Sequence, residues 1–190
     1  MNRLIAFMAL ATSVATAAAQ DTPPPIETVQ VVPGVHVLYG QGGNIGVSTG
    51  SDGMFLIDDQ YANLTDKVVE ALAKISPGQP RFVLNTHWHG DHTGGNENLA
   101  AKGSVILAHD RVRERMSSDN FSEFFKKTTP PSPPGALPIV TFNDSLSLHV
   151  NGDELRGIHV RAAHTDGDVC IHCRKANVIH TGDLVFAGMY

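Results

Sequence analysis

Short apolar runs separated by glycine-rich turns occupy the first part of the chain after residue 34. They predict the strands of a meander at residues 35–39, 44–49 and 54–57. The spacing of apolar residues then becomes helical, and Pro77-Gly78 ends the run. The apolar positions of this predicted helix are Leu64, Val68, Ala71, Leu72 and Ile75.

Strand and helix patterns alternate along the middle of the chain. The expected elements are a buried strand at 81–85, a short helix at 96–101, a strand at 104–108 and a polar helix at 110–116. This alternation predicts an α/β fold with parallel strand pairs. Residues 128–138 hold five of the 11 prolines and predict a loop within the same sheet system.

Strand patterns return from residue 141 onward. Alternating apolar residues at 146, 148 and 150 run into Asn151-Gly152, a strong signal for a two-residue hairpin turn. Further strands are expected at 158–163, 169–173 and 177–179. No internal repeat interrupts this order, so the pattern predicts one domain.

The composition narrows the class of protein. Of the 190 residues 42% are hydrophobic and 17% charged, which is typical of a globular chain, and the formal net charge of −5 argues against a nucleic-acid partner. Two cysteines are too few for a disulfide scaffold. Cys170 and Cys173 are three residues apart in a predicted strand, so their thiols should point to opposite faces, which disfavours a disulfide or a shared metal.

The N-terminal 19 residues have the pattern of a secretory signal peptide. A positive start at Arg3 precedes an uncharged apolar stretch, and Ala17-Ala18-Ala19 offers a small-residue cleavage site. The apolar stretch is too short to favour a retained membrane anchor. Residues 20–34 then predict an extended lead-in, and residues 35–190 the folded domain. We therefore expect a periplasmic or secreted protein with no stable membrane anchor.

The most informative motif is H-W-H-G-D-H at residues 87–92, directly after the strand expected at 81–85. In an extended chain residues i and i+2 point the same way, so His87 and His89 can present both imidazoles to one metal ion. The glycine allows a turn that sends Asp91 and His92 toward a neighbouring position, where a second ion could sit. Imidazole and carboxylate ligands suit Zn²⁺, and also Fe or Mn.

Two later segments supply further ligand types. His164 opens the sequence His-Thr-Asp-Gly-Asp after the strand expected at 158–163, and Asp183 closes His-Thr-Gly-Asp after the strand expected at 177–179. In open α/β sheets, functional sites gather where strands end. Each segment alone has an ordinary alternative, a strand-end polar residue or a cap, and only the combination with the first motif indicates a site.

In order and approximate spacing, these motifs resemble the metallo-β-lactamase superfamily of zinc hydrolases, over roughly residues 35–190. The resemblance implies a four-layer αβ/βα sandwich with one or two metal ions at an edge between its two sheets. It places His87, His89 and His164 on the first ion and Asp91 and His92 on the second. Asp183 would bridge both ions, as in the glyoxalase II-like branch, and Asp91 would also be catalytic by orienting the attacking water.

The resemblance also bears on supporting residues and on the branch of the superfamily. Asp58, Thr86 and Thr165 are candidates for orienting the ligands by hydrogen bonds, although Asp58 could equally be a plain turn residue. The presence of both His92 and Asp183 favours the broader hydrolase group over the lactamases that use a cysteine ligand.

One departure from the family pattern concerns the second metal. Members supply a last histidine from a strand beyond the Thr-Gly-Asp segment, followed by a helix, but the sequence stops at Tyr190 without one. His180 is the nearest substitute. We therefore expect a C-terminally truncated form that lacks its last strand or strands and a helix.

The function expected from these residues is an exported, zinc-dependent hydrolase whose metal-bound hydroxide cleaves an ester, thioester, lactone or lactam of a small-molecule substrate. The alternatives are a non-catalytic or partly active metal-binding fragment, and a di-iron oxidoreductase with a flavin partner. The oligomeric state stays open. Phe121, Phe124 and Phe125 could line an apolar approach to the metals, but a helix face packed on the core is the favoured interpretation.

Overall fold

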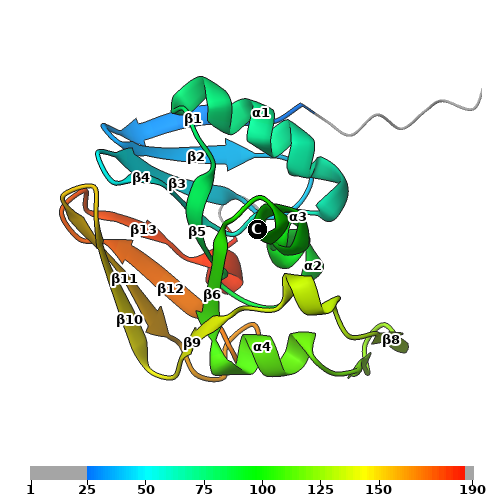
Figure 1. Ribbon diagram of the computed structural model, residues 1–190. Coiled ribbons are helices and arrows are strands. Elements are labelled where there is room, and N and C mark those ends of the chain that lie inside the picture. The colour runs from blue at the N-terminus through cyan, green and yellow to red at the C-terminus, as the bar shows by residue number, and fades with distance from the viewer. Residues whose placement is uncertain (1–24, 187–190) are drawn as a thin grey trace, which may run out of the picture.

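Two β-sheets lie face to face and carry helices on one side (Figure 1). The computed structural model describes residues 25–186, so the expected signal peptide at residues 1–19 lies outside the described part. Within residues 25–186, no helix is long and apolar enough to cross a membrane.

The first sheet mixes antiparallel and parallel pairs. Neighbouring strands pair antiparallel from β1 to β4 and parallel from β4 through β5 and β6 to β9, which confirms the parallel pairs expected from the alternating pattern. In spatial order its strands are β1 (Glu27–Val32), β2 (Val35–Tyr39), β3 (Ile45–Gly50), β4 (Gly53–Ile57), β5 (Pro80–Leu84), β6 (Val105–His109) and β9 (Val140–Phe142).

Helices α1 (Thr65–Ile75) and α3 (Asn96–Ala101) cover the outer face of this sheet (Figure 1). Strand β4 is buried on both faces because successive side chains alternate between two cores. Met54 and Leu56 pack in the core beneath α1 and α3, whereas Phe55 and Ile57 pack in the core between the two sheets. Both helices have the positions expected from sequence.

The second sheet is wholly antiparallel and consists of β10 (Ser145–Val150), β11 (Asp153–His159), β12 (Val169–Cys173) and β13 (Val178–His180). The turn between β10 and β11 has positive φ at Asn151 and Gly152, as the predicted hairpin requires. Along β12 the side chains alternate, so Cys173 is buried between the sheets and Cys170 is half-buried on the opposite face. Both cysteines are free, which confirms that they diverge.

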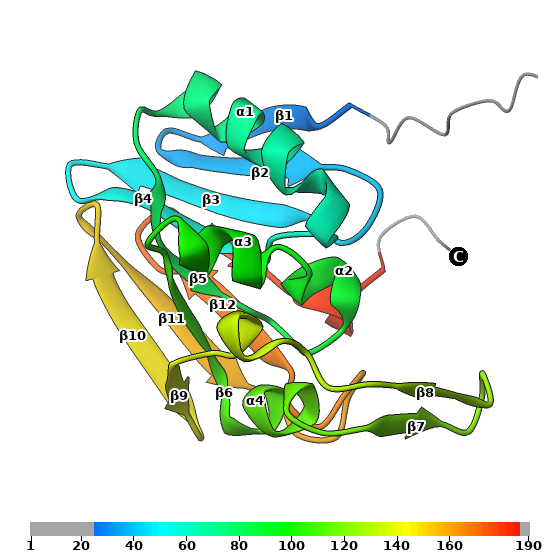
Figure 2. The same cartoon turned by 45° about the vertical axis from the view of Figure 1, so that its right-hand side comes forward.

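The outer face of the second sheet carries no α-helix within residues 25–186 (Figures 1 and 2). Ile158 and Ile179 are consequently exposed on it. The described residues thus form three layers of the expected sandwich: helices, mixed sheet and antiparallel sheet.

Two expected boundaries need correction. Part of the expected lead-in, Glu27–Val32, is rich in β-branched residues and pairs with β2 as the edge strand β1, so the folded domain begins before residue 35. The strand expected at 158–163 is wrong beyond His159, because β11 begins earlier, at Asp153, and ends at His159. Beyond it, the backbone of Asp168 accepts a hydrogen bond from the Val160 amide and closes a loop instead.

The phenylalanine segment is also not a helix. After α4 (Asp110–Met116), the chain forms the two-stranded hairpin β7 (Asn120–Ser122) and β8 (Lys127–Thr129), which reaches away from the body of the molecule (Figure 2). Phe121, Phe124 and Phe125 are exposed on it. The expectation of a helix face packed on the core is therefore wrong, because the segment pairs with itself as a hairpin and leaves these rings exposed.

Candidate metal centre

The H-W-H-G-D-H segment leaves β5 and enters the short helix α2 (Gly90–Thr93), at the end of the first sheet where the parallel strands terminate. A buried amide pair holds it from behind, because Asn85 and Asn96 donate hydrogen bonds to each other's side-chain oxygens at 3.1 and 2.9 Å. Asn85 also donates to the His92 carbonyl at 3.1 Å. The loop is therefore fixed by buried polar contacts as well as by its covalent connection to β5.

Asp58, which follows β4 with φ of 62°, supports the H-W-H-G-D-H segment, called here the ligand loop, from below. Its fully buried carboxylate accepts hydrogen bonds from the Thr86 amide at 2.7 Å and hydroxyl at 2.8 Å, and lies 2.8 Å from His92 Nδ1. Burial opposes its ionisation, but the attraction of His92 prevails and lowers the Asp58 pKa. These are the supporting contacts that the resemblance implied for Asp58 and Thr86.

Asp58 also orients two histidines. His92 Nδ1 faces the Asp58 carboxylate, so His92 Nε2 points away from this support. The Thr86 hydroxyl donates to Asp58 and can accept at 3.0 Å from His87 Nδ1, which turns His87 Nε2 in the same direction. Both Nε2 atoms face the cluster described next.

Three imidazoles and one carboxylate converge at a first position. His89 Nδ1 lies 3.1 Å from His87 Nε2 and 2.9 Å from His164 Nε2. Asp183 Oδ2 lies 3.4 Å from His164 Nε2 and 3.9 Å from His87 Nε2. These four atoms all lie within 4.8 Å of one another, a spacing at which one cation could contact them all.

A second group adjoins the first through Asp183. Its other oxygen, Oδ1, lies 3.1 Å from His92 Nε2, and Asp91 Oδ2 lies 3.5 Å from the same nitrogen. The two oxygens of Asp183 therefore face two different groups of side chains. The structure thus brings together all six residues proposed from sequence as ligands: His87, His89, Asp91, His92, His164 and Asp183.

The surroundings of the buried His92 Nε2 atom indicate whether this cluster suits a cation. Among the described residues this nitrogen makes no well-aligned hydrogen bond, although Asp183 Oδ1 lies 3.1 Å and Asp91 Oδ2 3.5 Å from it. Burial disfavours protonation of His92, but Asp58 and Asp183 outweigh it and raise the pKa to about 10. Positive charge is therefore favoured at this point, and a divalent ion would supply it. The nitrogen and oxygen donors fit Zn²⁺, Fe or Mn.

His164 comes from the loop at residues 160–168 between β11 and β12 in the second sheet. Asp168 organises this loop, because its carboxylate accepts from the Thr165 amide at 2.7 Å and hydroxyl at 2.6 Å. The Asp168 carbonyl accepts from the Val160 amide at 2.8 Å and lies 3.0 Å from His159 Nδ1. Thr165 is therefore bound to Asp168 and not to a ligand, so its expected supporting role is wrong, and Asp168 is the residue that sequence reasoning missed.

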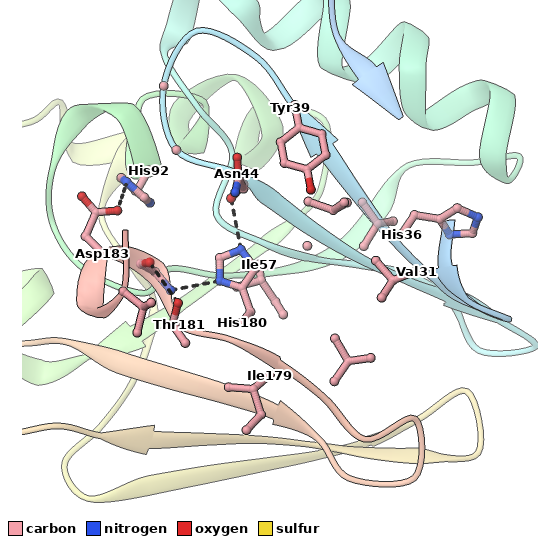
Figure 3. A pocket seen from close by; sticks show the side chains of 18 of the residues that line it. Val31, His36, Tyr39, Asn44, Ile57, His92, Ile179, His180, Thr181 and Asp183 are labelled. Atoms are coloured by element: carbon pink, nitrogen blue, oxygen red, sulfur yellow. Dashed lines mark hydrogen bonds and ion pairs between the residues drawn. The ribbon is translucent and has the colours of Figure 1, made fainter. Parts of the chain in front are cut away.

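Asp183 lies in the single turn η3 (Gly182–Leu184) after β13. Gly182 has φ of 52°, and a Cβ atom there would come within 2.7 Å of the Thr86 hydroxyl, so glycine permits the close approach of this turn to the ligand loop. His180, the substitute ligand considered from sequence, is engaged elsewhere through both of its ring nitrogens. Its Nε2 lies 3.1 Å from the Asn44 carbonyl and its Nδ1 accepts from the Gly182 amide (Figure 3).

Two cavities reach the cluster from different sides. The larger, about 710 Å³, lies between strands β2 and β3 and strand β13, with His92 and Asp183 at one end (Figure 3). The smaller, about 520 Å³, lies between the β7–β8 hairpin and the loop that carries His164. In the larger cavity a side chain at Gly43 would overlap the His92 ring, so glycine is required there.

The mixed α/β sandwich, together with the His/Asp group at the edge between its two sheets, places this protein in the class of metal-binding α/β proteins. Residues 36–189 match the family model of the metallo-β-lactamase superfamily, and the chain belongs to that superfamily.

Known relatives and structures agree with this assignment. The chain is 27% identical to hydroxyacylglutathione hydrolase of Erythrobacter litoralis over 106 residues, which is 55% of this chain and 34% of that enzyme. It is 32% identical to atrochrysone carboxyl ACP thioesterase of Aspergillus terreus over 54% of this chain and 26% of that enzyme. The matched region thus spans about a third or less of these relatives.

Among solved structures, a metallo-β-lactamase of Cronobacter sakazakii with an HARLDQ motif superposes with a TM-score of 0.72 at 21% identity, covering 86% of this chain and 65% of that one. The subclass B3 enzyme BJP-1 of Bradyrhizobium japonicum gives a TM-score of 0.65 at 18% identity, covering 82% of this chain and 60% of that one. These similarities establish the fold.

Proposed function

We propose that this protein is a metal-dependent hydrolase that cleaves a thioester or a related ester, lactone or lactam. The observation that carries the proposal is the convergence of three imidazole nitrogens and Asp183 within 4.8 Å, with His92 and Asp91 beside them. Relatives named as a hydroxyacylglutathione hydrolase and an ACP thioesterase support thioesters as the first substrates to test.

In this proposal the six clustered residues hold one or two ions, with zinc as the expected metal. A bound divalent ion would supply Lewis acidity and lower the pKa of water. Asp183 faces both groups and would couple them. The Asp91 carboxylate is partly exposed and bordered by the larger cavity, so it can orient a water molecule and accept its proton.

Metal content tests the ligand assignment. The chain is expressed in medium with zinc and iron, and bound metals are measured by mass spectrometry in wild type, His164→Ala and His149→Ala. His149 lies on β10 in the second sheet, away from the cluster, and serves as a matched histidine control. We expect zinc in wild type and His149→Ala and a clear loss in His164→Ala. Equal metal in all three proteins would refute the assignment.

Turnover separates the hydrolase from a non-catalytic metal-binding protein. Zinc-loaded wild type and His164→Ala are offered a thioester, an aryl ester, a lactone and a cephalosporin. We expect cleavage of at least one substrate by wild type and loss of that cleavage in the variant. Bound zinc without turnover of any substrate would favour the non-catalytic alternative, and bound iron with a flavin-dependent activity would favour the oxidoreductase.

We also propose export with removal of residues 1–19. Arg3, the uncharged stretch and Ala17-Ala18-Ala19 support this. The full chain is expressed in a bacterial host, and the intact mass of the periplasmic protein is measured. A product that begins at Gln20 is expected, whereas a product retaining Met1 in the cytoplasm would contradict the proposal.

A further inference from the structure

We infer that the groove between Trp88 and the β7–β8 hairpin binds an uncharged apolar group of the substrate, preferably an aromatic one, while the scissile carbonyl lies at the cluster. This inference rests on the proposed function and specifies its substrate class. The groove has a volume of about 520 Å³, and one of its walls contains His89 and His164 from the cluster. A group that fills the groove is thus contiguous with the reaction site.

The opposite wall of the groove is aromatic and faces solvent. Phe121 and Phe125 line it from the hairpin, with 58% and 76% of their surfaces exposed, whereas Trp88, whose ring centroid lies 4.6 Å from that of His89, lines the side of the cluster. Exposed phenylalanine rings beside a site leave apolar surface in contact with water, and a ligand can cover that surface. Aromatic rings also favour aromatic partners through stacked or edge-to-face contacts.

The charges of the groove favour an uncharged group. Arg115 and Asp166 are its only Lys, Arg, Asp or Glu side chains, and they neutralise each other through hydrogen bonds of 3.2 Å from Nε and 2.8 Å from Nη2. The guanidinium is therefore already occupied and offers no free cation to a phosphate or carboxylate. Within the described residues, the groove thus presents aromatic surface and an ion pair whose two charges are already matched.

The base of the hairpin is anchored while its tip is free, which fixes Phe121 relative to the cluster. Asn120 is buried and donates to the carbonyls of Arg115 and Ser118 at 2.6 and 2.9 Å. After β8, where the chain returns from the hairpin, the Ser132 amide donates to the Met116 carbonyl at 2.8 Å. Phe124, at the tip, is 87% exposed and does not line the groove. Its ring contacts that of Phe125 edge to face, with 4.9 Å between centroids, so Phe124→Ala reports the effect of losing a hairpin ring that does not itself line the groove.

Binding can be measured without catalysis because Trp88 is the chain's single tryptophan. The probe is 4-phenyl-1-butanol, with 1-butanol as the apolar but non-aromatic comparison, titrated against tryptophan fluorescence with and without zinc. We expect a saturable change in wild type and Phe124→Ala. In the double variant Phe121→Ala/Phe125→Ala, binding should weaken by about tenfold or more, since two aromatic contacts are removed. Equal affinity in all three proteins, or no saturable change, overturns the inference.

Turnover then identifies which side of the substrate enters the groove. Three thioesters are compared: S-ethyl thioacetate, S-ethyl 4-phenylbutanethioate and S-(3-phenylpropyl) thioacetate. A lower KM for either phenyl-bearing substrate, raised again in the double variant but not in Phe124→Ala, supports the inference and assigns the acyl or the thiol side. Equal KM values for all three substrates overturn it. Failure of all turnover despite saturable probe binding contradicts the proposed hydrolase function but leaves the apolar site standing.

The hairpin substitutions are on the surface, so the double variant is expected to fold. Circular dichroism and thermal melting of wild type, the double variant and Phe124→Ala check this directly. A melting temperature within a few degrees of wild type assigns any loss of binding to the groove itself. If the double variant is unfolded, the single variant Phe125→Ala replaces it in both experiments.

Discussion

The ligands of the cluster come from two regions that are held in place very differently. In the first sheet, His87 and His92 are each 1% exposed and lie on a loop fixed by Asp58 and by the Asn85–Asn96 pair. In the second sheet, the side chains of His164 and Asp183 are 28% and 21% exposed. The loop that carries His164 is held by Asp168 and by the exposed Arg115–Asp166 ion pair, and Asp183 lies in the single turn η3.

This difference indicates which half of the site is pre-formed. Buried, fully connected polar networks hold side chains in one arrangement without a ligand, whereas exposed turns are held by fewer contacts. A bound ion would connect the two halves, because His87 and His89 come from one sheet and His164 and Asp183 from the other. Metal binding should therefore stabilise the packing of the second sheet on the first.

The largest effect is expected from Asp58→Ala. The substitution leaves the Thr86 amide and hydroxyl and His92 Nδ1 without their buried partner. Removing one member of a buried charged network costs about 3–5 kcal/mol of unfolding free energy. Loss of a supporting carboxylate also lowers metal affinity about 10–100-fold. Urea denaturation and competition with a chromophoric chelator measure the two effects.

Asp119, which is exposed, provides the control for that experiment. Asp119→Ala should match wild type in both measurements. A stability loss in Asp58→Ala no larger than in Asp119→Ala would show that the first half of the site is not held by Asp58.

A smaller loss is expected from Asn96→Ala, which leaves the buried Asn85 side chain without its amide partner and the Ala136 carbonyl without a donor. Unsatisfied buried polar groups of this kind cost about 1–3 kcal/mol. Asn98→Ala, two residues further along the same helix and exposed, should cost less. Denaturation midpoints of the two variants compare them, and equal midpoints would contradict the proposed role of the amide pair.

Asp168→Ala tests the second half. The loop at residues 160–168 loses two side-chain hydrogen bonds to Thr165, at a cost of about 1–2 kcal/mol. Hydrogen exchange should accelerate in this loop and remain unchanged at residues 86–92. The exposed Asp119→Ala again serves as the control, since Asp119 lies outside this loop. Uniform acceleration across both regions would mean that the two halves are not independently held.

The smallest effect concerns the ion pair between Arg115 and Asp166. Both side chains are substantially exposed, and exposed ion pairs contribute about 0–1 kcal/mol. A double-mutant cycle of Arg115→Ala and Asp166→Ala, followed by urea denaturation, measures the coupling. A coupling above that range would indicate that the second region is held more firmly than its exposure suggests.

The elements that could be predicted from sequence are those whose pattern is local. The helical spacing from Leu64 to Ile75 gave α1, and Asn151-Gly152 gave the β10–β11 hairpin. The predictions failed where hydrogen bonds within a loop or a hairpin, which leave no periodic pattern in the sequence, decide the outcome. The strand expected to continue past His159 is interrupted because Asp168 closes a loop, and the phenylalanine segment forms a projecting hairpin.

The sequence by itself determined the kinds of ligand and their local grouping, because strand and turn geometry place His87, His89, Asp91 and His92 near one another. Only the tertiary structure brought His164 against His89, 75 residues away, and aligned the two oxygens of Asp183 with separate groups. It alone placed Asp58 beneath the ligand loop and the hairpin beside the groove. The physical reason is that periodicity reports local conformation and burial, whereas these distances depend on how two sheets pack through long-range contacts.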